Sequence, residues 1–186
     1  MSIIVGFVEL IAKNPNYQGE KRVYSPQTLS FNTARPFPMK LEFYVENFLY
    51  HLSLPDELIV YAYILIESLL FSGLVSQYNV HRMVFTALSI SYKLTLYSWV
   101  SDTQLEVIGG LQKGELVKLE KELLRILNWR IKFFRFKEVY EKISRVAIEL
   151  ESKTFREGAS ENENLCDFDD NIISTFSELE GFFCMK

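Results

Sequence analysis

The chain has 186 residues, a mass of 21.8 kDa and a formal net charge of −4 at pH 7. Hydrophobic residues make up 48% of it, enough to bury one core, and no apolar run reaches the roughly 18–20 residues of a membrane span. A net acidic chain also lacks the basic footprint of a dedicated nucleic-acid-binding protein. We therefore expect a folded globular protein with neither a membrane nor nucleic acid as partner.

The first half of the chain predicts three helices. Residues Ile3–Lys13 form an amphipathic segment that the following Asn-Pro-Asn stops, and residues 15–35 are expected to be irregular. Two prolines then precede a helix near Met39–Leu52, with its apolar residues on one face. After a capping serine and a proline, Asp56–Phe71 is apolar nearly all round, which predicts a buried helix.

The second half predicts four more helices. Val80–Leu94 mixes bulky residues with small ones, which allow neighbouring helices to approach closely. A short helix capped at Ser101-Asp102 ends at Gly109-Gly110, and Leu111–Asn128 and Phe134–Leu150 follow with helical apolar spacing. No segment keeps the alternation of a strand, so the pattern predicts an all-α bundle.

The last part of the chain differs in composition. Residues 151–186 carry nine acidic side chains against three basic ones, and their polar middle has little apolar surface to bury. We expect an acidic and mostly disordered tail. Both cysteines, Cys166 and Cys184, fall within this tail, so we do not expect a disulfide framework. We expect a cytoplasmic or nuclear location.

The residue inventory disfavours an enzyme. The chain has two histidines, His51 and His81, and lacks the HExxH, CxxC, G-x-S-x-G and nucleotide-binding glycine motifs. These histidines and the tail cysteines have no spacing suited to a metal site. We therefore expect no catalysis, no cofactor, no metal and no small-molecule substrate.

Several residues fall in a recognisable register. They are Asn79-Val80-His81-Arg82, Lys93, the paired Gly109-Gly110, Glu115-Leu116 and Leu119-Glu120. Over roughly residues 28–145 the chain resembles the cyclin box, and more narrowly the phosphate-pathway (P-type) cyclins and their plant U-type relatives. The resemblance implies a five-helix bundle with a short N-terminal helix and a C-terminal helix. It divides the chain into a lead-in (1–27), a cyclin box (28–150) and the acidic tail (151–186).

The resemblance also implies a function. Cyclins are regulatory subunits that bind and activate cyclin-dependent serine/threonine kinases, so the implied partner is such a kinase in a heterodimer. In the family, a lysine at the end of the third box helix and a glutamate in the fifth form the polar centre of the kinase contact. The matching residues here are Lys93 and Glu120. The apolar contact positions are Leu94, Leu124 and Ile131, with Phe85 and Leu88 as further candidates.

Two departures from the family pattern leave alternatives open. Many members form an ion pair between an arginine and an aspartate. This chain has Asn47 and Glu67 at those positions, and we expect a hydrogen bond between them to replace the ion pair. The two acids that often follow the lysine are replaced by Leu96 and Tyr97. The chief alternative is an adaptor with the cyclin fold that docks a kinase or another protein without activating it. A DNA-binding transcription factor with two such boxes is disfavoured, because the chain has one box and a net acidic charge.

Overall fold

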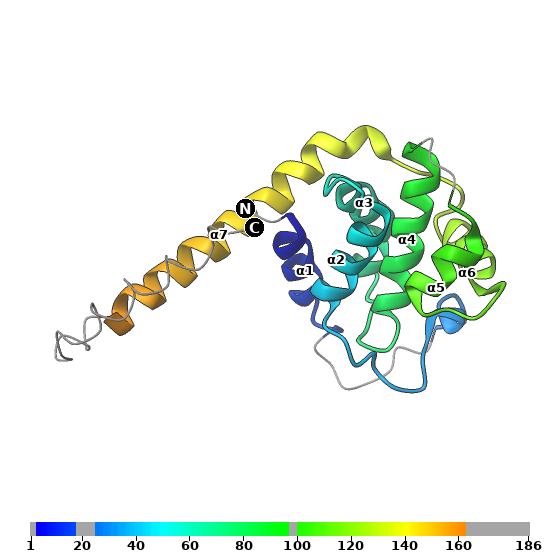
Figure 1. Ribbon diagram of the computed structural model, residues 1–186, viewed down its shortest axis with the longest axis horizontal. Helices are drawn as coiled ribbons and strands as arrows, with labels where there is room; N and C mark the ends of the chain where they lie inside the picture. The colour runs from blue at the N-terminus through cyan, green and yellow to red at the C-terminus, as the bar shows by residue number, and fades with distance from the viewer. Residues whose placement is uncertain (1–2, 18–24, 97–99, 163–186) are drawn as a thin grey trace, which may run out of the picture. The chain divides into compact units, whose positions relative to one another are not determined.

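The computed structural model describes residues 3–17, 25–96 and 100–162, with side chains up to residue 154. In these residues all regular elements are helices, and the predicted all-α bundle is confirmed (Figure 1). The elements are α1 (Ile3–Ala12), η1 (Leu29–Phe31), α2 (Leu41–Leu52), α3 (Leu58–Phe71), α4 (Val80–Thr95), α5 (Asp102–Gly109), α6 (Glu115–Ile126), η2 (Phe133–Arg135) and α7 (Phe136–Asn162). Within the same residues, no helix has the length and apolar character needed to cross a lipid bilayer.

The chain divides into two units, residues 1–150 and 151–186, and the helices that concern function lie in the first. The last helix was predicted to end at Leu150, but α7 continues to Asn162. The start of the expected tail is therefore helical. The rest of that tail, with both cysteines, lies outside the described residues.

Helix α4 is the centre of the first unit. It contacts α2, α3, α5 and α6, and Figure 1 shows it between α2 and α3 on one side and α5 and α6 on the other. Its small residues Ala87, Ser89 and Ser91 are all fully buried, which lets the neighbouring helices approach its backbone closely. Helix α3 is buried along most of its length, as its apolar composition predicts.

Backbone geometry makes α6 shorter than the predicted Leu111–Asn128. Gly114 has a left-handed φ of 76°, which suits a glycine and delays the helix start to Glu115. At the other end, Asn128 and Trp129 have φ of 50° and 58°, so the helix stops at Ile126. Two consecutive left-handed residues that are not glycine turn the chain sharply toward η2.

The two residues of the Gly109-Gly110 pair must be glycine for different physical reasons. Gly110 caps α5 with a φ of 65°, a conformation that side chains with a Cβ disfavour. Gly109 is needed for space, because a Cβ there would lie 2.4 Å from the Cζ of Phe85. This pair therefore fixes both the end of α5 and the packing of α5 on α4.

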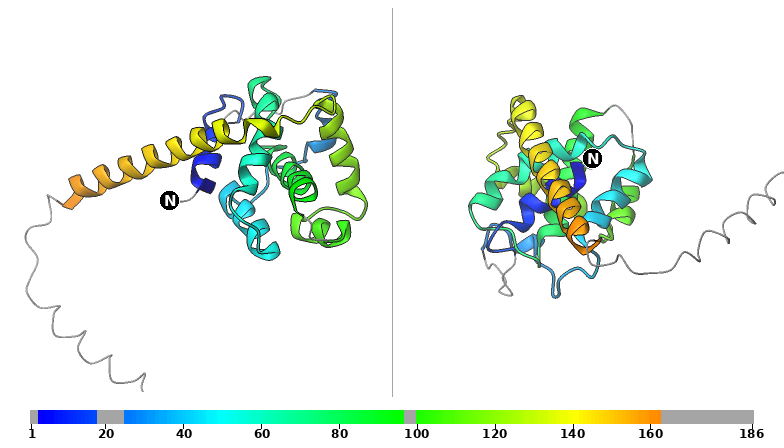
Figure 2. Two further views of the ribbon diagram at one scale, coloured as in Figure 1. Left: turned by 90° about the horizontal axis from the view of Figure 1, so that it is seen from above. Right: turned by 90° about the vertical axis from the view of Figure 1, so that its left-hand side faces the viewer.

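Helix α1 also crosses α7 at close range. A Cβ on Gly6 would lie 2.3 Å from the carbonyl oxygen of Ile143, and Figures 1 and 2 show the start of α7 passing over α1 and α3. Ile3, Phe7 and Ile11 of α1 are buried in the same core. The short N-terminal helix is therefore an integral part of the packing of this unit.

We predict that Gly6→Ala destabilises the fold by about 1–3 kcal/mol, because the added methyl group must push two helices apart. The free energy of unfolding in urea measures this loss. Gly114→Ala is the matched control, since nothing lies within 4 Å of a Cβ there and the cost is confined to backbone strain. A Gly6→Ala variant as stable as the natural chain would contradict the close crossing.

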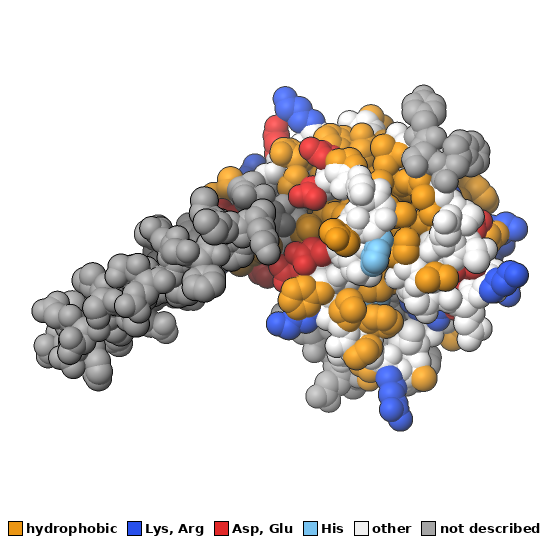
Figure 3. Space-filling view, in the orientation of Figure 1, with side chains coloured by type: hydrophobic (Ala, Val, Ile, Leu, Met, Phe, Trp, Pro, Cys, Tyr) orange, Lys and Arg blue, Asp and Glu red, His pale blue; other side chains and the backbone are white. Residues whose placement is uncertain are grey.

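Figure 3 shows apolar side chains gathered over α2 and α3 on one face of the molecule. Two of the exposed apolar residues of α2 are Phe43, at 55% exposure, and Tyr50, at 81%. The opposite face of α2 buries Val45 and Phe48 against the core. The helix is therefore amphipathic, as predicted, with aromatic residues on its outer face.

Candidate functional site

Lys93, in the last turn of α4, is held by carboxylates from two other helices. Its Nζ lies 2.6 Å from Oδ1 of Asp102, the first residue of α5, and 2.8 Å from Oε1 of Glu120 in α6. The hydroxyl of Ser89, one turn back on α4, donates a hydrogen bond of 2.7 Å to Glu120. The two residues that the sequence predicted to act together are thus in direct contact.

The Lys93 network is partly shielded from solvent. The Lys93 side chain is 32% exposed and that of Glu120 is 13% exposed. Burial by itself lowers the pKa of Lys93, but hydrogen bonds to Asp102 and Glu120 outweigh this and leave it raised. The ammonium group therefore stays charged at neutral pH, at a place where a partner can reach it.

Local capping places Asp102. The Ser101 side chain accepts a hydrogen bond from the backbone N–H of Gln104, and the Gln104 side chain accepts one from the N–H of Ser101. This capping box starts α5 at Asp102, where a carboxylate is also favoured by the helix dipole. Lys93 lies near the C-terminal end of α4, where the helix dipole favours a cation.

The predicted apolar contacts separate into two groups. Leu94 is 57% exposed, and Leu124 and Ile131 are partly buried, so these three have surface to offer a partner. Phe85 and Leu88 are both 0% exposed and lie in the core. Because other helices surround α4 along that stretch, these two side chains have no free surface in this conformation, and we remove them from the candidate interface.

The predicted contacts did not include Asp102, Trp129 or Phe134. Asp102 was recognised only as a capping residue, although its approach to Lys93 adds a second carboxylate. Trp129 is 67% exposed and Phe134 is 85% exposed, in the segment that follows α6. The signal for both aromatics was their position in a stretch rich in basic residues and without helical spacing.

Glu67 has different partners from the predicted one. Its carboxylate, in a residue only 5% exposed, accepts hydrogen bonds from Arg135 at 2.6 Å and from Lys142 at 2.9 Å. Both oxygens are thereby engaged, so the expected hydrogen bond with Asn47 is not what satisfies this group. Burial by itself raises the pKa of Glu67, but the bonds from Lys142 and Arg135 outweigh it and leave it lowered. Cations from η2 and α7 thus compensate for the arginine missing at position 47.

The residues around the start of α4 brace the bundle. The Asn79 side chain accepts a hydrogen bond from the Ser76 N–H and donates one to the Leu74 carbonyl, which closes the α3–α4 turn. The Arg82 guanidinium forms an ion pair with Glu115 at the start of α6. The four-residue motif at 79–82 is therefore explained by structure.

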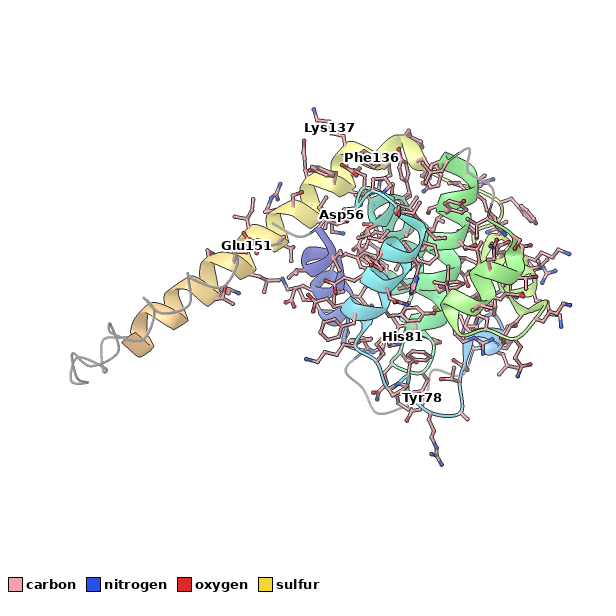
Figure 4. The ribbon with its side chains drawn as sticks, viewed as in Figure 1. Asp56, Tyr78, His81, Phe136, Lys137 and Glu151 are labelled. Carbon is pink, nitrogen blue, oxygen red and sulfur yellow. The ribbon has the colours of Figure 1, made fainter. Side chains whose placement is uncertain are left out.

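His81 is a buried member of that motif. Its Nε2 lies 2.9 Å from the carbonyl oxygen of Met39, and its ring packs on Phe37 and Tyr44. Figure 4 shows it at the far end of the bundle from Phe136, where α7 begins. Burial lowers the pKa of His81, against the opposing effect of its bond to Met39. The ring is a neutral structural group.

This burial predicts a pH dependence of stability. In the unfolded chain a histidine takes up a proton near pH ~6.5, whereas the folded state keeps His81 neutral. The unfolded state then binds more protons, so stability falls as pH drops below about 6.5. We expect His81→Gln to reduce the difference between the free energies of unfolding at about pH 7.5 and pH 5.5. His51→Gln, at an exposed position, is the control for the loss of a histidine from the chain.

Comparison with known proteins identifies the family. The family model for the cyclin N-terminal domain matches residues 20–132, a segment that includes α2 to α6 and the Lys93 network. A search of curated proteins gave no match. The matched segment covers more than half of the chain, and its helices form the expected bundle. The chain belongs to the cyclin family.

Proposed function

We propose that this chain is a cyclin of the P-type or U-type group that binds and activates a cyclin-dependent serine/threonine kinase. The observation that carries the proposal is the contact between Lys93 and Glu120, two residues 27 positions apart that α4 and α6 bring together. Family membership implies a regulatory protein that carries out no chemistry of its own.

The geometry of the Lys93 network suits the centre of a protein interface. A partly shielded ion pair retains polar capacity for a few directional hydrogen bonds, which fix the register of two surfaces. Leu94, Leu124 and Ile131 supply apolar area beside it to exclude water. Polar groups with an apolar surround are typical of interface residues that carry much of the binding energy.

Activation then follows from selective binding. A kinase is active when the αC helix places its glutamate against the catalytic lysine. A partner that binds this inward state better than the outward state shifts the population toward it. In this proposal the Lys93 network and its apolar neighbours make the contacts that distinguish the two states.

An adaptor that docks a kinase or another protein without activating it is the second candidate. Two observations favour it: Asp102 and Glu120 already hold the Lys93 ammonium, and Leu96 stands where the family often has an acid. Tyr97, at the other such position, lies outside the described residues. A kinase contact must then add to or replace the bonds that Lys93 makes within the chain.

Affinity purification of the tagged chain from its native cells, with mass spectrometry and a kinase assay on the eluate, separates the two. A serine/threonine kinase present in equal amount and active supports the cyclin proposal. A bound kinase without activity favours the adaptor. Recovery of another protein with no kinase would also favour the adaptor and would contradict the cyclin proposal.

A further inference from the structure

A second surface lies between α3 and α7, and we call it the α3–α7 groove. It is a cavity of about 730 Å³ between the second half of α3, the end of α6 and the start of α7. Its apolar lining consists of Ile64, Leu65, Phe71, Ile126 and Leu127. None of its lining residues is among those retained for the proposed kinase contact, but Arg130 and Lys132 flank Ile131, so the groove adjoins that contact.

The charges in the groove do not cancel. Arg135 bonds to both Glu67 and Glu138, and Lys142 bonds to Glu67, so these two cations and two carboxylates neutralise one another. Arg130 and Lys132 remain, both exposed and on the lining. Among the described residues neither side chain has an acidic partner, so the surplus charge of the groove is positive.

The groove is too open for a small-molecule site. Pockets for such ligands enclose most of the ligand surface, whereas Phe71 here is 79% exposed, and Asn128, Arg130 and Lys132 are exposed too. Phe71 is nevertheless held in place, because the Nζ of Lys142 lies 5.5 Å from its ring centroid. An exposed aromatic ring beside two unpaired cations suits a segment of polypeptide with acidic and apolar residues.

We propose that the α3–α7 groove binds an acidic peptide segment of a partner protein. Its carboxylates contact Arg130 and Lys132, and an apolar side chain of the segment packs on Phe71 and enters the groove toward Ile126. The proposal goes beyond kinase activation, since it assigns a docking role to residues outside the retained kinase contact.

The test is fluorescence anisotropy with the full chain and the labelled peptide GSDDFDDISG. We expect it to bind about tenfold more tightly than the analogue with asparagine at the four aspartate positions. The double variant Arg130→Glu with Lys132→Glu should lose that advantage. Phe71→Ala should weaken binding of both peptides, and the exposed position of this residue makes a folding defect unexpected.

A matched control keeps the test independent of net charge. Lys113→Glu with Lys118→Glu makes the same change of charge at exposed positions outside the groove, and should bind the acidic peptide as the natural chain does. Equal loss in both double variants would reduce the effect to general electrostatics and overturn the proposal. Equal affinity for the acidic and asparagine peptides would also overturn it. A dimer in sedimentation that the Phe71→Ala variant abolishes would assign the groove to a second copy of this chain instead.

Discussion

Lys93→Ala combined with Glu120→Ala is expected to abolish both co-purification of a kinase and phosphorylation of a histone-type substrate by the eluate. In the proposed complex these side chains provide the central polar contacts, and truncation of such residues costs about 2 kcal/mol or more each. Affinity would then fall by a factor of about a thousand. A pull-down with the natural and variant chains, followed by the kinase assay, measures both losses.

The double variant is preferred to either single one for a structural reason. Lys93 and Glu120 bond to each other, so removal of Lys93 alone leaves the Glu120 carboxylate without its cation in a partly shielded place. Removal of both avoids that penalty. Asp102 then loses its cation, but its side chain is 44% exposed to water, and Ser89 loses one hydrogen bond, so we expect only a small drop in the melting temperature. Glu9→Ala with Lys13→Ala is the control, because it deletes an exposed ion pair on α1. If the Lys93 and Glu120 double variant still recovers an active kinase, the interface assignment is wrong.

Much of the fold could be predicted from local sequence signals. Apolar spacing predicted the helices, and glycine, proline and capping residues located most of their ends. Lys93 and Glu120 were assigned to one site through a family resemblance, and the structure places them in direct contact. What local signals miss is backbone geometry away from glycine, such as the left-handed Asn128 and Trp129 that end α6 early.

Contacts between distant segments were harder to predict. Glu67 was expected to bond with Asn47, but its partners Arg135 and Lys142 are 68 and 75 positions further along the chain. No sequence spacing brings η2 and α7 to α3; the packing of aromatic rings does, as when Tyr61 contacts Phe133 and Phe136. Asp102 shows the same limit. Its position at the start of a helix could be predicted from the sequence, whereas its ion pair with Lys93 could not.

The burial of Phe85 shows why surface residues are hard to assign from sequence in a helix that is covered on most sides. In an amphipathic helix, apolar residues beside a functional lysine divide into inner and outer ones. Helix α4 is covered on most sides, so residues one or two turns before Lys93 enter the core, and only Leu94 at its end stays exposed. Exposure, and not distance along the chain from Lys93, decides which residues are available to a partner protein.

This distinction makes Phe85→Ala the variant with the largest expected effect on stability. The ring is fully buried, packs edge-on against Phe48 with centroids 5.4 Å apart, and fills the space that Gly109 leaves open. Its removal leaves a cavity between α2, α4 and α5, and comparable truncations cost about 3–5 kcal/mol. Urea unfolding, monitored by circular dichroism, measures the loss directly.

Leu94→Ala is the counterpart that separates packing from binding. Leu94 is 57% exposed, so its truncation should change the free energy of unfolding by no more than about 0.5 kcal/mol. It should nevertheless reduce the amount of kinase recovered, since it removes apolar area beside Lys93. For Phe85→Ala, kinase recovery should fall only in proportion to the folded fraction, and Phe85→Leu should restore much of both. A stable Phe85→Ala chain that fails to bind would return Phe85 to the interface and require α4 to open when the kinase docks.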